Sequence, residues 1–600
     1  MTEQVDYYKE LELGRNLNEE ELDKQLKALI RKWRNRTNAP DQDVRHKAEM
    51  MMDMAEEAMD IFTNPSKKAA YDKELKERMD TPEQNEPEPR PNENEQLEHD
   101  RSYKKIGIDL GTTNSAVAYI DEQGIPQIIE NREGDRTTPS VLLYEDGGFI
   151  VGIHAKEASV DDPENTVQFI KRQMGDEKYK FITEDDIEFK PEELSAVILK
   201  RLKKDAEDVL GEPVNEAVIT VPAYFDDAQR KATQDAGKIA GLNVLKIINE
   251  PTAAALAYSN DMAEKQNILV YDLGGGTFDI TVMEYSPEKV RVLSTAGDKN
   301  LGGFDFDNEI SKFFIKKFEE DHGVDVYEDE EALQDLRVKS EEAKKTLSSR
   351  MKAKFSIYVE GQKLKAEITR EEFQSMTQRF IDRTALIMED AIEDAGLEFD
   401  DLDKVLLVGG STRMPAVEEL IKEDTGIIPS KELNPDEIVA MGAAIQAEMI
   451  DEDSIDFQKE VIDVNAHSLG VLTLSSENNV EFNNIVLPKN TAVPAEGIDE
   501  FISLNDNQEA MRLPITEGED TDPDYVKVIG DCIVKLPPNQ PAGYLVETRI
   551  AYDENGVVHV RVFDGKTQEF LGEAEIERTS NLTQREVDEL ENKLADIRID

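Results

Sequence analysis

A short pattern occurs twice in this chain, and each copy directly follows an apolar run. The residues IDLGTT at positions 108–113 recur as YDLGGGT at positions 271–277. A glycine tip lets backbone N–H groups approach phosphate oxygens closely, and threonine hydroxyls add further donors. A single copy is usually a plain turn. Two copies, each placed between strands, predict duplicated lobes that clamp a nucleotide between facing hairpins.

A third glycine-rich run, VGGSTR at positions 408–413, ends an apolar strand and precedes a helical segment. Taken alone, it fits a tight strand–helix turn equally well. Together with the two hairpins it predicts the floor of a nucleoside site, because Gly409 and Gly410 leave room for a flat ring.

Composition narrows the class of protein. The 600 residues carry 130 acidic and 70 basic side chains, and the formal charge of −60 repels nucleic acid and anionic membranes. A single cysteine, Cys532, excludes an intrachain disulfide framework. The first residues do not have the form of a secretion signal, and no run of 18 apolar residues occurs. We therefore expect a soluble cytoplasmic protein that binds neither nucleic acid nor membrane.

The pattern of apolar residues divides the chain into segments. Strands that alternate with helices indicate an α/β domain, and recurrent short strands without helical periodicity indicate a β domain. The predicted divisions are a helical domain at 1–79, a Pro- and Glu-rich tether at 80–102, the α/β domain at 103–455, a linker at 456–463, the β domain at 464–578 and the start of a helix at 579–600.

Two local patterns mark the last part of the chain. The turn residues 553–556 predict a hairpin between strands at 548–552 and 557–562. Thr583 and Glu586 have the spacing of a capping box, which predicts that a helix begins there and runs over 583–599.

Several longer runs resemble the ATPase domain of the seventy-kilodalton heat-shock (DnaK-type) chaperones. With the β domain and the final helix, the resemblance covers about four-fifths of the chain. It implies an actin-like pair of α/β lobes followed by a β-sandwich that binds peptides, with ATP, ADP and Mg²⁺ as ligands. The matching runs are GIDLGTTNS (107–115), VPAYF (221–225), INEPTAAA (248–255), DLGGGTFD (272–279), LGG (301–303), GGSTRMP (409–415) and NPDE (434–437).

The resemblance also implies roles for individual residues. Mg²⁺ would be held by Asp109, Asp272 and Glu250, largely through water. Lys171 would lie beside the transferred phosphate, where the reaction needs positive charge, and Asp279 would position the attacking water. The implied catalytic group is Lys171, Asp279, Thr277, Asp109 and Glu250. The other implied nucleotide contacts are Gly111, Thr112, Thr113, Asp272, Gly274, Gly275, Glu341, Lys344, Ser348, Gly409, Gly410 and Arg413. The spacing of 341, 344 and 348 fits one helix face, and it equally fits ordinary surface charge patterning.

Coupling between the two domains is implied at two positions. Pro222 and Arg230 match a proline and an arginine through which the family links nucleotide state to its second domain. The linker departs from the family pattern, because Lys459 and Glu460 replace apolar residues. We expect these charges to be costly in the apolar groove that the family's linker occupies, which would weaken the coupling.

The β domain resembles the family's peptide-binding sandwich. Leu474, Phe501, Leu504 and Met511 fall where the family lines its peptide cleft, although ordinary packing in the sandwich core explains them equally well. Met511 replaces a smaller branched residue, which predicts a shallower pocket. In the family a long helical lid follows, whereas only a short helix follows here. The sequence therefore predicts a cleft without a lid, from which peptides dissociate quickly.

Residues 1–79 look like a J domain whose signature is altered. The His-Pro-Asp loop that is the signature of J domains reads Ala39-Pro40-Asp41 in this chain, so the histidine is missing. This favours a helical docking module over a domain that stimulates ATP hydrolysis.

The sequence thus predicts an ATP-dependent chaperone of the DnaK type, with unfolded or apolar peptides as partners. A separate J-domain co-chaperone and a nucleotide exchange factor are further candidate partners. The alternative is a nucleotide-switched scaffold that binds one folded partner without general chaperone activity.

Overall fold

The structure is a computed structural model that describes residues 104–258, 264–323, 326–359, 362–430, 434–450, 459–475, 480–553, 558–575, 582–595 and 597–600. The predicted J-like domain and tether, and residues 456–458 of the predicted linker, lie outside the described residues. The described residues fall within one compact unit, 103–600. Among them, no helix combines the length and the apolar character that crossing a bilayer requires.

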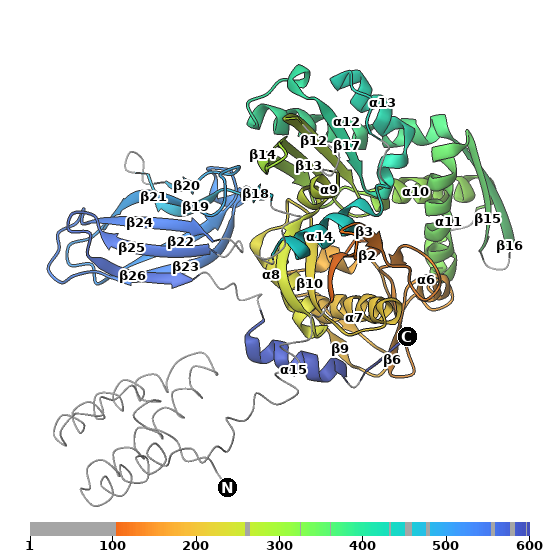
Figure 1. Cartoon of the computed structure of the whole chain (residues 1–600), viewed down its shortest axis with the longest axis horizontal. Helices are drawn as coiled ribbons and strands as arrows, with labels where there is room; N and C mark the ends of the chain where they lie inside the picture. Colours follow the sequence, from red (N-terminus) through yellow and green to blue (C-terminus); the bar gives the residue numbers. More distant parts are fainter. Residues whose placement is uncertain are drawn as a thin grey trace, which may run out of the picture. The chain divides into compact units, whose positions relative to one another are not determined.

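The repeated pattern lies at the centre of two sheets built to the same plan (Figure 1). In each sheet, the strand before the hairpin pairs antiparallel with the strand after it and parallel with a later strand. The predicted duplication is therefore confirmed. In lobe I the order is β11 (Asn243–Asn249), β10 (Val214–Val221), β1 (Lys104–Asp109), β2 (Asn114–Ile120) and β3 (Pro126–Ile128); in lobe II it is β17 (Lys404–Val408), β12 (Gln266–Leu273), β13 (Phe278–Tyr285), β14 (Lys289–Asp298) and β18 (Glu460–Ile462).

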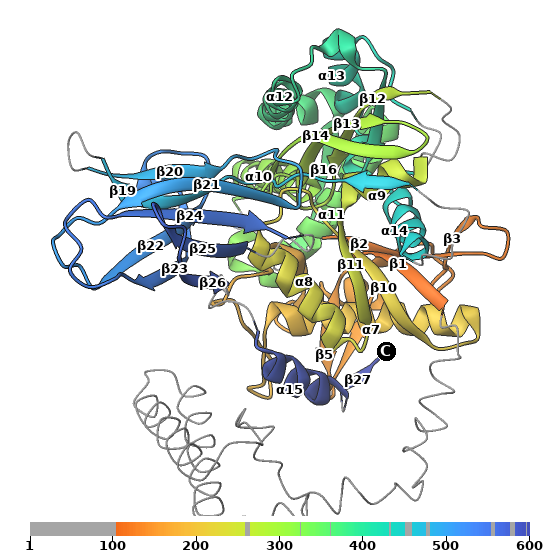
Figure 2. The ribbon, with the colours of Figure 1, turned by 60° about the vertical axis from the view of Figure 1, so that its left-hand side comes forward.

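Two helices join the lobes at their base. Helix α14 (Ile438–Met449) packs on the lobe I sheet, α9 (Glu250–Tyr258) packs on the lobe II sheet, and the two helices pack on each other. They approach so closely that a Cβ atom on Gly442 would lie 1.7 Å from the backbone oxygen of Ala253. Helix α9 begins at Glu250 and contacts strands of both sheets, so this packing positions a carboxylate between the lobes. Figure 2 shows the ribbon from a second direction.

Further elements surround the two sheets. The small sheet formed by β5, β6 and β7 and the helices α7 and α8 belong to lobe I, and the helices α10 to α13 belong to lobe II. In lobe I the bounds are β4 (Thr138–Pro139), β5 (Leu142–Glu145), β6 (Gly148–Val151), α6 (Ile153–Ala158), β7 (Thr166–Val167), η2 (Ile170–Gln173), β8 (Phe181–Ile182), β9 (Glu188–Phe189), α7 (Pro191–Leu210) and α8 (Asp227–Ile239). In lobe II they are α10 (Gly303–His322), η4 (Val326–Glu328), α11 (Glu330–Ser349), β15 (Lys352–Val359), β16 (Gln362–Thr369), α12 (Arg370–Asp394), η5 (Phe399–Asp401), η6 (Gly410–Arg413) and α13 (Pro415–Thr425).

The β domain consists of two four-stranded sheets around a shared apolar core. The predicted hairpin is confirmed, since β24 pairs antiparallel with β25. One sheet has the order β20 (Glu481–Leu487), β19 (Leu469–Leu474), β22 (Ala510–Glu517) and β23 (Lys527–Lys535); the other has β21 (Ala495–Ile502), β24 (Leu545–Tyr552), β25 (Val558–Asp564) and β26 (Phe570–Glu575), and η7 spans Pro523–Tyr525.

The linker residues Lys459 and Glu460, at the start of strand β18 (Glu460–Ile462), are less costly than we expected from the sequence. Lys459 and Glu460 have partners rather than unpaired charges: the Lys459 ammonium lies 4.2 Å from the centre of the Tyr285 ring and donates to its hydroxyl at 2.7 Å. Glu460 forms an ion pair of 3.2 Å with Lys289 on the neighbouring strand β14. Burial lowers the pKa of Lys459 to about 8, so seating this lysine still has a cost. With Lys459 and Glu460 partnered in this way, the linker can extend the lobe II sheet as strand β18.

The C-terminal segment was predicted only in part. Thr583 and Glu586 form the predicted capping box, and α15 spans Gln584–Ala595. The helix ends earlier than predicted, because Arg598–Ile599 forms a short strand, β27, that pairs with β6 of lobe I.

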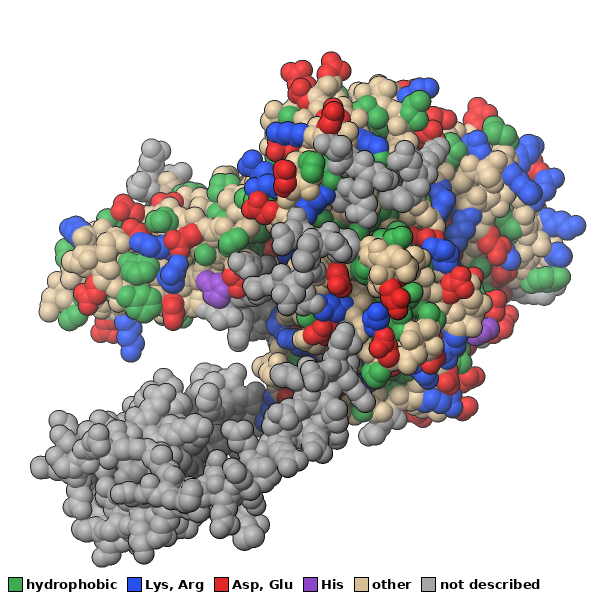
Figure 3. All heavy atoms as spheres, in the orientation of Figure 1, with side chains coloured by type: hydrophobic (Ala, Val, Ile, Leu, Met, Phe, Trp, Pro, Cys, Tyr) green, Lys and Arg blue, Asp and Glu red, His purple; other side chains and the backbone are tan. Residues whose placement is uncertain are grey.

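The space-filling view shows acidic and basic side chains interspersed over the surface of the lobes and the β domain (Figure 3). On this face no broad basic area gathers among the described residues.

Candidate nucleotide-binding site

The two glycine-rich hairpins meet face to face. A Cβ atom on Gly275 would lie 2.3 Å from Thr113 Cγ2, and one on Gly276 would lie 2.4 Å from Thr112 Cγ2. Only glycine allows such an approach, which explains the longer glycine run in the second hairpin. The second tip is closed by a hydrogen bond of 3.1 Å from Gly274 N–H to the Thr277 carbonyl. The hairpins therefore face one another as the sequence predicted.

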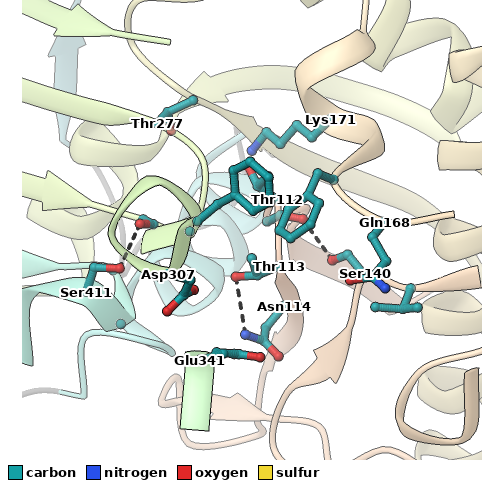
Figure 4. Close-up of a pocket in the computed structure, with 18 of the residues that line it drawn as sticks. Thr112, Thr113, Asn114, Ser140, Gln168, Lys171, Thr277, Asp307, Glu341 and Ser411 are labelled. Atoms are coloured by element: carbon teal, nitrogen blue, oxygen red, sulfur yellow. Dashed lines mark hydrogen bonds between the residues drawn. The ribbon is translucent and has the colours of Figure 1, made fainter. Parts of the chain in front are cut away.

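A cavity of about 730 Å³ opens beside these tips, which is a volume typical of sites for small ligands. Figure 4 shows Lys171 and Thr277 at one end and Glu341 at the other, with Thr113 between them. Among the predicted nucleotide residues, the cavity lining includes Asp109, Gly111, Thr112, Thr113, Lys171, Glu250, Asp272, Gly274, Gly275, Thr277, Glu341, Lys344, Ser348, Gly409, Gly410 and Arg413. This cavity thus brings together residues that lie up to about 300 positions apart in the chain.

Three carboxylates, those of Asp109, Glu250 and Asp272, lie with Lys171 at the phosphate end of the cavity. Lys171 is only 4% exposed, and its Nζ donates to Glu250 Oε1 at 2.5 Å. Asp272 Oδ2 is buried and has no hydrogen-bond partner. Burial and the neighbouring Glu250 raise the pKa of Asp109 to about 7, and burial with the surrounding carboxylates raises that of Asp272 as well. The cluster therefore has an excess of negative charge, and Lys171 compensates for only part of it.

This arrangement fits Mg²⁺. A divalent cation would satisfy the unpartnered Asp272 oxygen and would neutralise the crowded carboxylates. Within the part of the chain that the structure describes, no three Asp, Glu, His or Cys side chains are grouped closely enough to surround a metal ion directly. A Mg²⁺ ion held by Asp109, Glu250 or Asp272 would thus keep most of its water ligands, as this ion usually does.

Asp279 differs from the other predicted catalytic residues because it does not line the cavity. It is 1% exposed, and its Oδ1 accepts a hydrogen bond of 2.9 Å from the backbone N–H of Tyr224. Burial, followed by the charge of Glu250, raises the pKa of Asp279 to about 7. Its oxygen is thus fixed by the loop that follows β10.

The two predicted coupling residues also meet at this loop: Pro222 lies in it, and Arg230 reaches it from helix α8. Pro222 is buried, and Arg230 donates to the backbone oxygens of Ala223 and Phe225 at 3.1 and 3.2 Å. Arg230 also donates to Asn249 Oδ1, and Asn249 Nδ2 donates to Asp463 of the linker at 2.8 Å. Hydrogen bonds therefore connect the linker to the loop that holds Asp279.

At the opposite end of the cavity, the predicted nucleoside residues are held by ion pairs. Glu341 pairs with Lys156 at 2.6 Å across the cleft and with Lys345 at 2.7 Å on its own helix. Although burial acts in the other direction, the two lysines lower the pKa of Glu341 to about 2. Lys344 donates to Asp307 Oδ2 at 2.8 Å, and Arg413 pairs with Asp436 at 2.6 Å. The spacing of 341, 344 and 348 therefore does place these residues along one wall of the cavity.

Several cavity residues were missed by the sequence reasoning. Asp307 lines the cavity with one carboxylate oxygen unpartnered, and burial raises its pKa to about 6. Ser411 and Ser140 donate to the backbone oxygens of Gly274 and Gly111, at 2.9 and 2.8 Å, and so brace the two hairpins. Ser411 lies inside the glycine-rich motif at 408–413, so the sequence could have indicated it as a site residue. Asp307 lies within helix α10 and Ser140 directly follows β4, and neither belongs to a motif that would have identified it from the sequence.

The four predicted peptide-cleft residues do not share one environment. Phe501 and Met511 are buried in the core of the β domain, whereas Leu474 and Leu504 are 37% and 61% exposed. Two of the four apolar side chains are thus at the surface, and the other two belong to the core of the β domain.

The raised pKa of Asp279 predicts a pH-dependent stability in the absence of Mg²⁺ and nucleotide. Its pKa rises from an ordinary value of 3.8 to about 7 on folding, so the stabilising contribution is complete below pH 3.8 and is lost as the pH rises to about 7. We expect the melting temperature to fall over this range, and to fall less in the Asp279→Asn variant. Thermal unfolding of both proteins between pH 5 and 8 would check this; equal pH slopes would contradict it.

Two lobes of the same plan, a cavity between facing hairpins and a following β domain define a two-lobed ligand-binding protein with a β-sheet partner domain. A family model described as Hsp70 protein matches residues 105–598. Two relatives named Chaperone protein DnaK, from two strains of Halobacterium salinarum, are each 42% identical over 500 residues, which covers 82% of this chain and 77% of each relative. The chain therefore belongs to the Hsp70 family.

Family membership establishes the general activity. Proteins of this family are ATPases that bind ATP and ADP with Mg²⁺, and this chain is a chaperone of the Hsp70 type. The match begins at residue 105, so the predicted J-like domain lies outside it. The roles of individual site residues stay predictions.

Proposed function

We propose that this chain hydrolyses ATP in the cavity between the hairpins and thereby controls the binding of apolar peptide segments by its β domain. The observation that carries this proposal is a set of contacts that runs from Asp279, which is paired in the sheet with the cavity residue Asp272, to the β domain. Asp279 is held by Tyr224, and Tyr224 contacts His467, which lies just before β19. The ring centres of Tyr224 and His467 are 4.3 Å apart, and the His467 ring nitrogen lies 3.2 Å from the Tyr224 carbonyl.

Within the cavity we assign roles by position and charge. The backbone N–H groups of the two hairpins, with Thr112, Thr113 and Thr277, would hold the phosphates. Mg²⁺, when bound, supplies neutralisation of phosphate charge. Lys171 would stabilise the charge that develops on the transferred phosphate. Asp279, which lies behind the cavity lining, would help to position the attacking water.

At the other end, Glu341, Lys344 and Arg413 would contact the nucleoside. The ion pair of Lys156 with Glu341 would close the lobes over the nucleotide, because it joins α6 of lobe I to α11 of lobe II. Opening this pair would be one requirement for nucleotide exchange.

Coupling between the domains would follow the hydrogen bonds from Asp463 through Asn249 and Arg230 to the loop of Tyr224. A shift of the linker would change the position of that loop, and with it the oxygen of Asp279. Coupling should therefore be stronger than the altered linker sequence suggested, since Lys459 and Glu460 are both partnered.

A test is the rate of ATP turnover with and without an unfolded apolar peptide. Chaperone activity predicts that the peptide stimulates turnover, and that a peptide of equal length with its apolar residues replaced by serine does not. If neither peptide changes the rate of ATP turnover, the result would instead favour the scaffold alternative, for which the family match gives no support. A separate J-domain co-chaperone and an exchange factor are further proposed partners, and addition of each to the same assay would test them.

A further inference from the structure

A second hollow adjoins the phosphate end of the nucleotide cavity. It has a volume of about 300 Å³, and Thr277 lines both this hollow and the cavity. Phe225 also lines the hollow, and the centre of its ring lies 5.7 Å from Nζ of the cavity residue Lys171. Thr277 and Phe225 therefore form part of the wall between the two spaces. We call the second hollow the vestibule and define it by Thr277, Phe225, Arg172, Lys299 and Lys527.

Three cationic side chains from separate parts of the fold line the vestibule. Arg172 lies in η2, Lys299 directly follows strand β14, and Lys527 begins strand β23 of the β domain. Two carboxylates, those of Asp176 and Asp226, line it as well. The cations thus outnumber the acids here, although the whole chain has 130 acidic and only 70 basic side chains. This local balance of charge favours a small anion as the ligand of the vestibule.

Two of these cations have binding capacity that the fold does not use. Arg172 donates through Nε and Nη2 to the Gly276 carbonyl and through Nη2 to Asp305, whereas its Nη1 forms no hydrogen bond with the described residues. The side chain of Lys299 is exposed, and it forms neither an ion pair nor a hydrogen bond within the described part of the chain. An anion could therefore bind to both side chains without breaking a contact of the folded protein.

The positions of the two products of hydrolysis determine how each can depart. ADP would occupy the hairpins and the nucleoside end, whereas inorganic phosphate would lie at the end that holds Lys171 and Thr277 (Figure 4). While ADP is bound, it lies between the phosphate and the nucleoside end, so the phosphate cannot leave along the cavity. The space on the other side of Thr277 is the vestibule.

We propose that the vestibule is the exit path for inorganic phosphate, and that its cations guide the anion out while ADP stays bound. This inference rests on the proposed hydrolysis of ATP between the hairpins. It also gives the β domain a part in product release, because Lys527 lines the vestibule and pairs with Asp226 of lobe I at 3.1 Å. Movement of the β domain away from lobe I would remove one of the three cations and slow the departure of phosphate.

Phosphorus NMR exchange measurements test the path, with inorganic phosphate as the probe and the full chain loaded with ADP and Mg²⁺. A cation beside the path lowers the barrier in both directions, so reversing its charge slows entry and exit together. We expect Lys299→Glu with Lys527→Glu to lower both rates about tenfold, to leave the dissociation constant of phosphate unchanged, and to differ less from the unmodified chain at high salt. Unchanged rates would exclude the path. Faster exit would show that the cations trap phosphate, which would also overturn the proposal.

A separate measurement distinguishes this path from the hydrolysis on which it rests. Acid quench of a single turnover reports the conversion of bound ATP to ADP, and we expect the double variant to convert ATP at the normal rate, because neither lysine lines the nucleotide cavity. Absence of conversion in the unmodified chain would refute the proposed hydrolysis. Normal conversion with unchanged phosphate exchange in the variant would refute the exit path alone.

Two further variants separate the charge of Lys527 from its contact with lobe I. Lys535→Glu makes the same change at the other, exposed end of β23, outside the vestibule, and should leave phosphate exchange unchanged. Asp226→Asn breaks the pair with Lys527 but keeps the lysine, and asparagine can still cap α8 by accepting from Gln229 N–H. Because it removes a negative charge from the vestibule, it should speed exchange about twofold. If it slows exchange as Lys527→Glu does, the contact between domains sets the rate and the proposal is wrong.

Discussion

Replacing Lys171 with alanine should abolish ATP turnover, with a loss of about 100-fold or more, while nucleotide binding is kept. Lys171 contacts the carboxylate cluster at the phosphate end through its 2.5 Å bond to Glu250. Phosphoryl transfer depends mainly on positioning and on the stabilisation of charge, so the loss of this ammonium acts on the transition state. Binding relies on the hairpins and on the nucleoside end, which the substitution leaves intact. Single-turnover hydrolysis and nucleotide titration would separate the two effects.

A matched control is Lys178→Ala, which removes an exposed lysine of the same lobe and should leave turnover unchanged. Lys171→Met keeps the aliphatic stem in its buried position and removes only the charge. If Lys171→Met hydrolysed ATP at the normal rate, the charge of Lys171 would have no part in the reaction, and the role assigned to it here would be wrong.

The nucleotide site was largely predictable because its residues lie in local motifs. The tips at 108–113 and 271–277 require glycine and threonine for reasons of turn chemistry alone, and the two copies implied the paired sheets. Asp307 could not be predicted, because a single aspartate on a helix has no local signal. Its neighbour Lys344 comes from another helix, and only the packing of α10 on α11 brings the two together.

For the linker and α15, the sequence could not predict which residues lie opposite them in the fold. The sequence indicated the cost of burying Lys459 and Glu460, and the lowered pKa of Lys459 agrees with part of that cost. It could not indicate that Tyr285 and Lys289 lie opposite these residues, because both partners belong to a distant segment of the chain. Likewise, the capping box predicted where α15 begins, but an apolar helix face does not specify which surface covers it.

The second large effect concerns the peptide cleft. A fluorescent apolar heptapeptide should bind weakly and dissociate quickly with ADP as well as with ATP. The loss of a closing element acts mainly on the dissociation rate, since the encounter rate depends on diffusion and orientation. The packing of α15 against lobe I supports this expectation, because the buried face of that helix is not available to cover a peptide. Stopped-flow dissociation in the two nucleotide states would measure it, and a slow off-rate with ADP would show that some other element closes the cleft.

Single residues of the cleft can be tested in the same assay. Met511→Asp should abolish peptide binding, because it places an unpaired charge in an apolar environment. Met511 is 6% exposed and packs in the core of the β domain, so its replacement also threatens the fold. Leu504→Asp avoids this difficulty, since Leu504 is exposed, and it should weaken binding without unfolding the domain.

Ala510→Asp is the matched control, because Ala510 precedes Met511 on β22 and is exposed, so it introduces the same charge outside the core. We expect this variant to bind peptide normally. The three proteins together distinguish a cleft from simple core packing: if Leu504→Asp and a folded Met511→Asp protein both bind as the unmodified chain does, the peptide sits elsewhere on the β domain. If only Met511→Asp loses binding, and circular dichroism shows that its β domain has unfolded, Met511 is a core residue and not part of the cleft.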